Sequence, residues 1–213
     1  MTLVAFDFDG TLSDSEMTVL LGERIDVADD MAEITSRAMN DEIGYAESVR
    51  ERAALLEGLP EAKAQAAYDN VELREGAADL IETLNDDGIT TAILTGGFER
   101  GVASALERNG VSVDHILSNR LPIVDGELTG EAEGPLIEGT KDDALEELAA
   151  DRGVEMDETI AVGDGANDLP MLEVAGLAIG FDPKPAVEPS CEVVVETMDE
   201  LHDVLLENGV LEA

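Results

Sequence analysis

The chain has almost no cysteine and few aromatic residues. Its single cysteine, Cys191, excludes an intrachain disulfide, and its place beside a valine run favours the core or a strand edge over a nucleophile. Aromatic residues make up 3% and tryptophan is absent, so we expect a core of Ala, Val, Leu and Ile, which a hydrophobic content of 44% supplies. No transmembrane-length run or signal peptide is visible, so we expect a cytoplasmic enzyme.

Positive charge is also scarce. Lysine and arginine total 12 against 50 acidic residues, a formal net charge of −38. The hydrophobic fraction and clear periodicity argue against disorder. Solvated acidic faces on a globular protein from a high-salt cytoplasm fit better, because salt screens self-repulsion. The charge disfavours nucleic acid and anionic membranes as partners.

Alternating strand and helix patterns predict an α/β fold with a parallel sheet and right-handed crossovers. At 213 residues the chain is either one large domain or a core with a small insertion. A hairpin is expected at Asp125-Gly126. Strands are predicted at 3–6, 89–94, 113–118, 159–163, 177–181 and 192–195, and helices at 76–87, 98–109, 139–152, 167–174 and 198–207.

Residues 14–70 differ, because they show helical periodicity and almost no strand-type run. Helices are predicted at 14–22, 27–39, 45–57 and 61–69, with Pro60 at a helix start. We expect an insertion after the first strand to lie above the carboxyl ends of the strands and to cover a site there. We therefore predict a catalytic core of residues 1–13 and 76–213 with a helical cap of residues 14–75.

The first strand runs directly into Asp7-Phe8-Asp9-Gly10-Thr11. Asp7 and Asp9 point to the same side of an extended chain and repel each other unless a cation such as Mg²⁺ lies between them. This arrangement suits phosphoryl transfer, with one carboxylate attacking phosphorus. The other then protonates the leaving oxygen and later activates water. An ordinary Asp-Gly turn is the alternative.

Two later segments offer groups that bind phosphate. Thr95-Gly96-Gly97, between a strand and a helix, provides a hydroxyl and open backbone N–H groups, although an ordinary strand-to-helix turn reads the same way. Lys141 is one of three lysines and opens a helix, where a cation opposes the helix dipole. Pairing with an anion explains that position better than a solvated surface lysine does.

The segment Gly163-Asp164-Gly165-Ala166-Asn167-Asp168 supplies a third acidic strand end. Asp164 is the expected direct ligand that completes a Mg²⁺ site. Asp168, one helical turn further on, is expected to orient Lys141 or a metal-bound water. Asn167 is expected to hydrogen-bond near the phosphate or the metal.

In this order, these segments resemble the motifs of the haloacid dehalogenase superfamily of phosphohydrolases. The resemblance implies a Rossmann-like three-layer parallel-sheet core with a small helical cap after the first strand. The helical insertion and the second and fourth motifs look like the phosphoserine phosphatase branch, nearly end to end. Thr95 replaces a usual Ser. The substrate-binding positions of that family are matched by Glu16, Met39, Tyr45 (for a usual Phe) and Arg52.

The resemblance implies Mg²⁺-dependent hydrolysis of O-phospho-L-serine through an aspartyl phosphate, the last step of serine biosynthesis. Asp7 is then the nucleophile and Asp9 the acid and base, and Mg²⁺ is held by Asp7, the Asp9 carbonyl and Asp164. Thr95, Gly96 and Lys141 stabilise phosphoryl charge. Arg52 suits the substrate carboxylate and Glu16 its ammonium.

Several alternatives stay open. Another small phosphomonoester, such as phosphoglycolate or a sugar phosphate, is a possible substrate, and a different alcohol is a possible acceptor. A phospho-aspartate receiver domain fits poorly. Receiver domains lack a second aspartate two residues after the nucleophile and lack a helical cap, and this chain has both. Glu16 and Arg52 also fit solvated helix faces, and Arg50 is readily confused with Arg52. Oligomeric state is undetermined.

Overall fold

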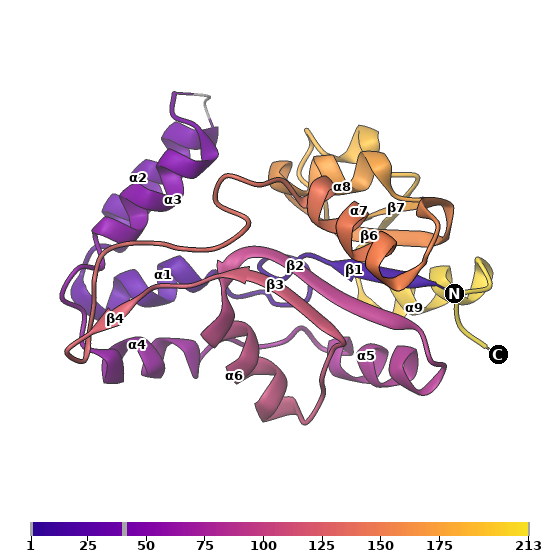
Figure 1. Ribbon diagram of the computed structural model, residues 1–213, viewed down its shortest axis with the longest axis horizontal. Coiled ribbons are helices and arrows are strands. Elements are labelled where there is room, and N and C mark those ends of the chain that lie inside the picture. Colours follow the sequence, from indigo (N-terminus) through magenta and orange to yellow (C-terminus); the bar gives the residue numbers. More distant parts are fainter. Residues whose placement is uncertain (1, 40–41, 213) are drawn as a thin grey trace.

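A computed structural model describes residues 2–39 and 42–212. Within them, six parallel strands form one sheet in the order β3-β2-β1-β6-β7-β8, which confirms the predicted α/β fold. The first strand lies in the middle, between β2 and β6 (Figure 1). The strands are β1 (Leu3–Phe6), β2 (Thr90–Phe98), β3 (His115–Asn119), β6 (Thr159–Gly163), β7 (Leu177–Phe181) and β8 (Val193–Val195).

Helices cover both faces of this sheet, so β1 is buried on each side. The covering helices are α5 (Ala77–Asp86), α6 (Glu99–Asn109), α7 (Lys141–Arg152), α8 (Leu169–Val174) and α9 (Met198–Glu207), with the 3₁₀ turns η2 (Met156–Glu158), η3 (Ala166–Asp168) and η4 (Glu188–Ser190) (Figure 1). Leu3 and Ala5 pack with α7 and α8, whereas Val4 and Phe6 pack with α5, α6 and α9. This alternation follows the two-residue period of a strand.

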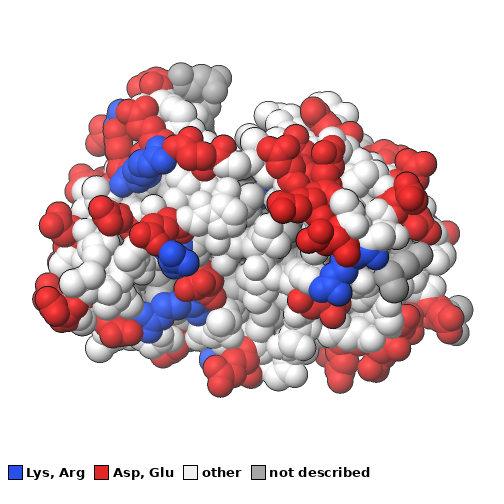
Figure 2. Space-filling model, in the orientation of Figure 1, with Lys and Arg blue, Asp and Glu red and all other residues white. Residues whose placement is uncertain are grey.

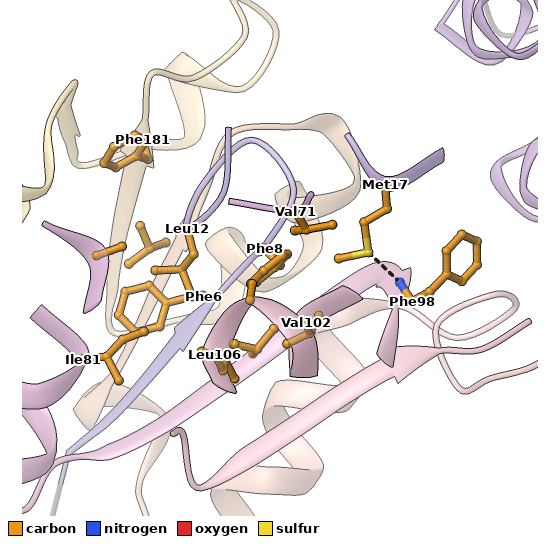
Figure 3. Packing of buried hydrophobic residues seen from close by; sticks show 14 of the residues in the cluster. Phe6, Phe8, Leu12, Met17, Val71, Ile81, Phe98, Val102, Leu106 and Phe181 are labelled. Carbon is orange, nitrogen blue, oxygen red and sulfur yellow. Dashed lines mark hydrogen bonds between the residues drawn. The ribbon is translucent and has the colours of Figure 1, made fainter. Parts of the chain in front are cut away.

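The core includes phenylalanine despite the low aromatic content of the chain. All four phenylalanines are buried, so the expectation of a purely aliphatic core is wrong in this respect. Figure 3 shows Phe6 and Phe8 beside Ile81, Val102 and Leu106. A phenylalanine buries more apolar area than an aliphatic side chain, so a chain with few of them gains most by placing each inside.

The segment between β1 and α5 forms a helical unit at one end of the sheet (Figure 1). Two neighbouring chain segments join it to the sheet: the Ser13 hydroxyl donates to the Glu72 carbonyl at 2.7 Å, and the Arg74 N–H donates to the Leu12 carbonyl at 2.9 Å. The helices of this cap are α1 (Met17–Gly22), η1 (Glu23–Ile25), α2 (Ala28–Met39), α3 (Tyr45–Ala54) and α4 (Glu61–Tyr68).

The predicted hairpin at Asp125-Gly126 is present as β4 (Ile123–Val124) and β5 (Glu127–Leu128). Its main chain bonds to the segment between α3 and α4: the Gly58 N–H donates to the Leu128 carbonyl, and the Leu128 N–H donates to the Leu59 carbonyl, both at 2.9 Å. A hairpin from the second half of the chain therefore supports the cap. The domain boundaries after residues 13 and 75 stay a prediction.

None of the helices in the described part of the chain combines the length and apolar composition needed to cross a membrane.

Candidate active site

The candidate residues gather where three neighbouring strands end. Asp7 follows β1, Asp164 follows β6, and Thr95 lies near the end of β2. The Asp7 N–H donates to the Val162 carbonyl at 2.9 Å, so pairing with β6 continues past the end of β1. Carboxyl ends of parallel strands share one sheet edge, which is why residues distant in sequence meet here.

Lys141 is the central cation of the site. It opens α7, is 3% exposed, and places Nζ 2.6 Å from Oδ1 of Asp7 and 2.5 Å from Oδ1 of Asp168. The other Asp168 oxygen, Oδ2, accepts the N–H groups of Asp164 at 3.0 Å and Gly165 at 2.8 Å. Asp168 thus fixes both the lysine and the loop that carries Asp164.

The site holds more negative charge than Lys141 offsets. Burial and the neighbouring Asp168 raise the pKa of Asp7 to about 7, although Lys141 opposes that rise. Burial, Glu16 and Asp7 raise the pKa of Asp9 well above its ordinary value. Burial alone would lower the pKa of Lys141, but Asp168 and Asp7 raise it, so the lysine stays charged.

Asp9, two residues after Asp7, has an incomplete hydrogen-bonding environment. Its Oδ1 is buried, and no described residue hydrogen-bonds to it. A Cβ added to Gly97 would lie 3.0 Å from its Oδ2, so the carboxyl group reaches the end of β2. A buried oxygen without a partner needs a ligand or a proton.

Oxygen atoms of Asp7, Asp164 and Asp168 lie within 4.8 Å of one another. Both Asp168 oxygens are held by Lys141 and the main chain at 2.5–3.0 Å. Asp164 makes only longer contacts, 3.1 Å to the half-exposed Lys184 and 3.4 Å to Thr11, so Asp7 and Asp164 are the candidate metal ligands. An all-oxygen set with excess negative charge and an orphaned Asp9 oxygen fits a hard divalent cation. The residues present therefore accommodate a divalent metal.

The Thr95–Gly97 segment differs from its prediction. The strand does not stop at Leu94 but continues to Phe98, with a register irregularity against β3 between Leu94 and Phe98. Within it the Gly97 N–H donates to Thr95 Oγ1 at 3.0 Å. The Phe98 N–H points to Met17 Sδ at 3.3 Å, which tethers the strand end to the cap (Figure 3). A bulge here re-aims the chain without ending the strand.

The cap residues predicted to bind substrate are held loosely. The Arg52 guanidinium is half-buried and donates to the Ser48 carbonyl at 3.3 Å and the Thr18 hydroxyl at 3.4 Å. Glu16, just before α1, is exposed, but partial desolvation by the surrounding protein raises its pKa, while Lys184 and Arg52 lower it. Arg50, on the same helix as Arg52, pairs instead with Glu138.

Three further predicted positions need separate description. Tyr45 begins α3 and lies over Gly96, where an added Cβ would overlap its hydroxyl. Asn167 is exposed, and its Oδ1 is folded over Gly165. Met39 ends α2, but its side chain lies outside the described residues.

Sequence reasoning missed several supporting residues. Lys184 Nζ lies 3.1 Å from Oδ2 of Asp164, and the Thr11 hydroxyl donates to Oδ1 at 3.4 Å. The Asn119 amide donates to the Gly96 carbonyl at 3.0 Å, and the Arg74 guanidinium donates to the Gly10 carbonyl at 3.0 Å. Lysine scarcity was a signal for Lys184; the others follow only from tertiary contacts.

Acidic side chains greatly outnumber lysines and arginines on the face shown in Figure 2. In contrast, the cations at the site are placed singly against carboxylates: Lys141 against Asp7 and Asp168, and Lys184 against Asp164. Two of the three lysines thus lie where carboxylates converge.

Comparison with known proteins gives consistent results. The model of the haloacid dehalogenase-like hydrolase family matches residues 4–173. A phosphoserine phosphatase of Halobacterium salinarum is 54% identical over 99% of this chain and 100% of its own length. One from Methanocaldococcus jannaschii is 36% identical over 95% of both chains.

Solved structures agree. A phospho-aspartyl intermediate analogue of a phosphoserine phosphatase has a TM-score of 0.87 and 35% identity, covering 97% of this chain and 98% of its own. A substrate-bound phosphoserine phosphatase complex has a TM-score of 0.87 and 34% identity, covering 97% of both chains. On its motifs, its fold and these full-length similarities, the chain belongs to the haloacid dehalogenase superfamily and, within it, to the phosphoserine phosphatase family.

Proposed function

We propose that this protein is a magnesium-dependent phosphoserine phosphatase that works in the cytoplasm and converts O-phospho-L-serine to L-serine and phosphate. The observation that carries the proposal is the buried contact of Lys141 with Asp7 and Asp168 beside Asp164, in a chain similar end to end to phosphoserine phosphatases. The small phosphoester is the partner that this site fits.

Asp7 is the proposed nucleophile. Lys141 engages its Oδ1, and no described residue donates a hydrogen bond to its Oδ2. That second oxygen attacks phosphorus in line, so a bond forms between Oδ2 and phosphorus while the bond to the serine oxygen breaks. The product of this half-reaction is an aspartyl phosphate.

Asp9 is the proposed acid and base. Its pKa is raised by burial and by Glu16 and Asp7, so it holds a proton that the departing serine oxygen accepts. The resulting carboxylate then takes a proton from water, which attacks the phosphorus of the aspartyl phosphate. Phosphate leaves, Asp7 is regenerated and Asp9 is protonated again.

Lys141 and the Thr95–Gly97 segment are proposed to stabilise phosphoryl charge. The Thr95 hydroxyl accepts from Gly97, which leaves its own O–H free to donate to a phosphoryl oxygen. Bound Mg²⁺ would be held by Asp7, Asp164 and the Asp9 main-chain carbonyl and would supply positive charge against the phosphoryl oxygens. Asp168 would keep Lys141 in place.

The cap is proposed to select the serine moiety. Arg52 suits the substrate carboxylate through a bidentate pair, and Glu16 suits the ammonium. The long contacts of Arg52, 3.3 and 3.4 Å, leave its guanidinium free to exchange partners.

Phosphate release from a panel of phosphoesters tests this proposal. The panel contains phosphoserine, phosphoethanolamine, phosphoglycolate and a sugar phosphate, each with Mg²⁺ and with chelator. We expect the highest kcat/KM for phosphoserine and no turnover in chelator. A higher kcat/KM for phosphoglycolate or the sugar phosphate would overturn the assigned substrate. Full activity in chelator would overturn the proposed requirement for Mg²⁺.

A further inference from the structure

The cap reaches the Thr95–Gly97 segment through one side chain. Tyr45 is the first residue of α3, and a Cβ added to Gly96 would overlap its hydroxyl oxygen and lie 3.1 Å from its ring carbon Cζ. Glycine at position 96 therefore leaves the space that the tyrosine hydroxyl fills. The Asn119 amide, at 3.0 Å from the Gly96 carbonyl, holds the peptide in that orientation.

The hydroxyl of Tyr45 has a proton to donate. No described residue forms a hydrogen bond with it, and Tyr45 is 41% exposed, so a ligand in the site has access to it. Desolvation by the surrounding protein raises the pKa of this phenol above its ordinary value, which keeps it protonated at neutral pH. The charges of Lys141 and Asp7 both act on it, which places the hydroxyl in the electrostatic field of the reacting groups.

We propose that the Tyr45 hydroxyl donates a hydrogen bond to the phosphoryl group bound at Thr95 and Gly96, which makes it a phosphate-binding residue supplied by the cap. A phenylalanine would fill the same apolar space without a donor. The contact would also make phosphate binding depend on the cap being seated, because α3 carries the hydroxyl. This inference rests on the proposed function in taking a phosphomonoester as the ligand.

Binding of inorganic phosphate in Mg²⁺ buffer, measured by calorimetry on the full chain, tests the contact directly. Phosphate has no serine moiety, so a Tyr45 that contacts only the serine part leaves this affinity unchanged. Because the acceptor is charged, we expect Tyr45→Phe to weaken phosphate binding about tenfold to one-hundredfold. Phosphate affinity equal to that of the wild type would overturn the proposal.

Tyr68→Phe is the matched control, because the chain has two tyrosines and this one is buried in α4 with its ring 5.8 Å from the Arg100 guanidinium carbon. It loses the same hydroxyl outside the site, and we expect phosphate affinity within about twofold of the wild type. An equal loss in both variants would mean that the Tyr45 effect is structural and would overturn the proposal.

A double-mutant cycle with Gly96→Ala tests the geometry. The added methyl displaces the Tyr45 hydroxyl, so Tyr45→Phe in that background should cost less than about threefold in phosphate affinity. Full additivity of the two substitutions would show that the hydroxyl does not act at Gly96 and would overturn the proposal.

The two proposals fail separately. If wild-type protein does not hydrolyse phosphoserine but Tyr45→Phe still weakens phosphate binding, the assigned substrate is wrong and the Tyr45 contact stands. If phosphoserine is hydrolysed and Tyr45→Phe leaves phosphate affinity intact, the assigned substrate stands and the Tyr45 contact is wrong.

Discussion

Lys141, on the core side of the site, is 3% exposed and lies 2.6 and 2.5 Å from its two carboxylate partners. Arg52, on the cap, is only half-buried and makes hydrogen bonds of 3.3 and 3.4 Å. The core cation is fixed before any ligand arrives, whereas the cap cation is free to exchange partners. We infer that the chemical step is pre-organised in the core and that substrate choice is made by a looser cap.

The largest expected effect is on the core side. Asp7→Asn removes the proposed nucleophile, so we expect turnover to fall by about 10⁴-fold or more while the far-ultraviolet circular dichroism spectrum is kept. Asp14→Asn, at an exposed position, is the control and should retain activity. Near-normal phosphate release by Asp7→Asn would show that the roles are assigned wrongly.

Lys141→Met tests the buried charge cluster through stability. It leaves the Asp7 and Asp168 carboxylates buried without their cation, so we expect the free energy of unfolding at pH 7.5 to fall by about 3–5 kcal/mol. Lys63→Met, at an exposed position of α4, should change it by less than about 0.5 kcal/mol. Equal urea midpoints for the two variants would mean that the contacts of Lys141 with Asp7 and Asp168 contribute little to stability.

The cap side should show selectivity rather than loss of chemistry. Arg52→Ala strands the substrate carboxylate, so kcat/KM should fall about tenfold or more for phosphoserine and little for phosphoethanolamine, which lacks that carboxylate. Glu16→Gln should lower kcat/KM more for phosphoserine than for phosphoglycolate, which lacks the ammonium.

Arg50→Ala is the matched control for Arg52, because Arg50 lies on the same helix and pairs with Glu138. It should leave the ratio between phosphoserine and phosphoethanolamine unchanged. Uniform losses on all three substrates in the Arg52 and Glu16 variants would mean that these residues are structural.

The raised carboxyl pKa values predict a dependence of stability on pH in metal-free protein. The pKa of Asp7 rises from 3.8 to about 7 on folding, so between these values the folded state binds more protons than the unfolded one. Stability from this group is therefore greatest below pH 3.8, declines as pH rises from there to about 7, and is fully lost above about 7, a loss on the order of a few kcal/mol.

Urea unfolding of wild type and Asp7→Asn at pH 5 and pH 7.5, both in molar KCl to screen the surface, measures that contribution. The wild type should lose more stability between the two pH values. Mg²⁺ affinity should rise over the same window, because the metal requires ionised ligands. If Asp7→Asn loses as much stability between pH 5 and pH 7.5 as the wild type does, the raised pKa does not belong to Asp7.

The smallest expected effect is at the cap surface. Arg37 lies 2.7 Å from Glu51, with about a third of each side chain exposed, so Arg37→Met should cost less than about 1 kcal/mol and almost nothing in molar KCl. The cost of Lys141→Met should be nearly the same in dilute and molar KCl. Urea melts at both salt concentrations provide the test, and an equal salt response of both variants would erase the contrast between core and cap.

Much of this site follows from local sequence signals. Asp7, Asp164 and Lys141 each lie at a strand end or a helix start, and these boundaries are readable from hydrophobic periodicity and glycine positions. Within the part described, the helices and strands lie within a few residues of their predicted ranges. The exception is β2, where the sequence predicts an end at Leu94 and the strand reaches Phe98, because pairing with β3 resumes after an irregularity.

Other features depend on contacts between distant segments. The hairpin at Asp125-Gly126 was predictable as a hairpin, but its hydrogen bonds to the cap residues Gly58 and Leu59 were not. The contact between Lys184 and Asp164 likewise depends on how the loop after β7 packs. The sequence around each of these residues does not indicate which distant residue it contacts.

The sequence alone determined the element order, the parallel sheet and the identity of the central acidic and basic residues, because these depend on local periodicity and on residue chemistry at strand ends. Only the tertiary structure decided which carboxylate each cation contacts, how far Asp7 and Asp9 are desolvated, and that the Tyr45 hydroxyl lies on Gly96. The physical reason is that desolvation and charge pairing depend on distance in space, and separation along the chain, 134 residues between Asp7 and Lys141, does not encode that distance.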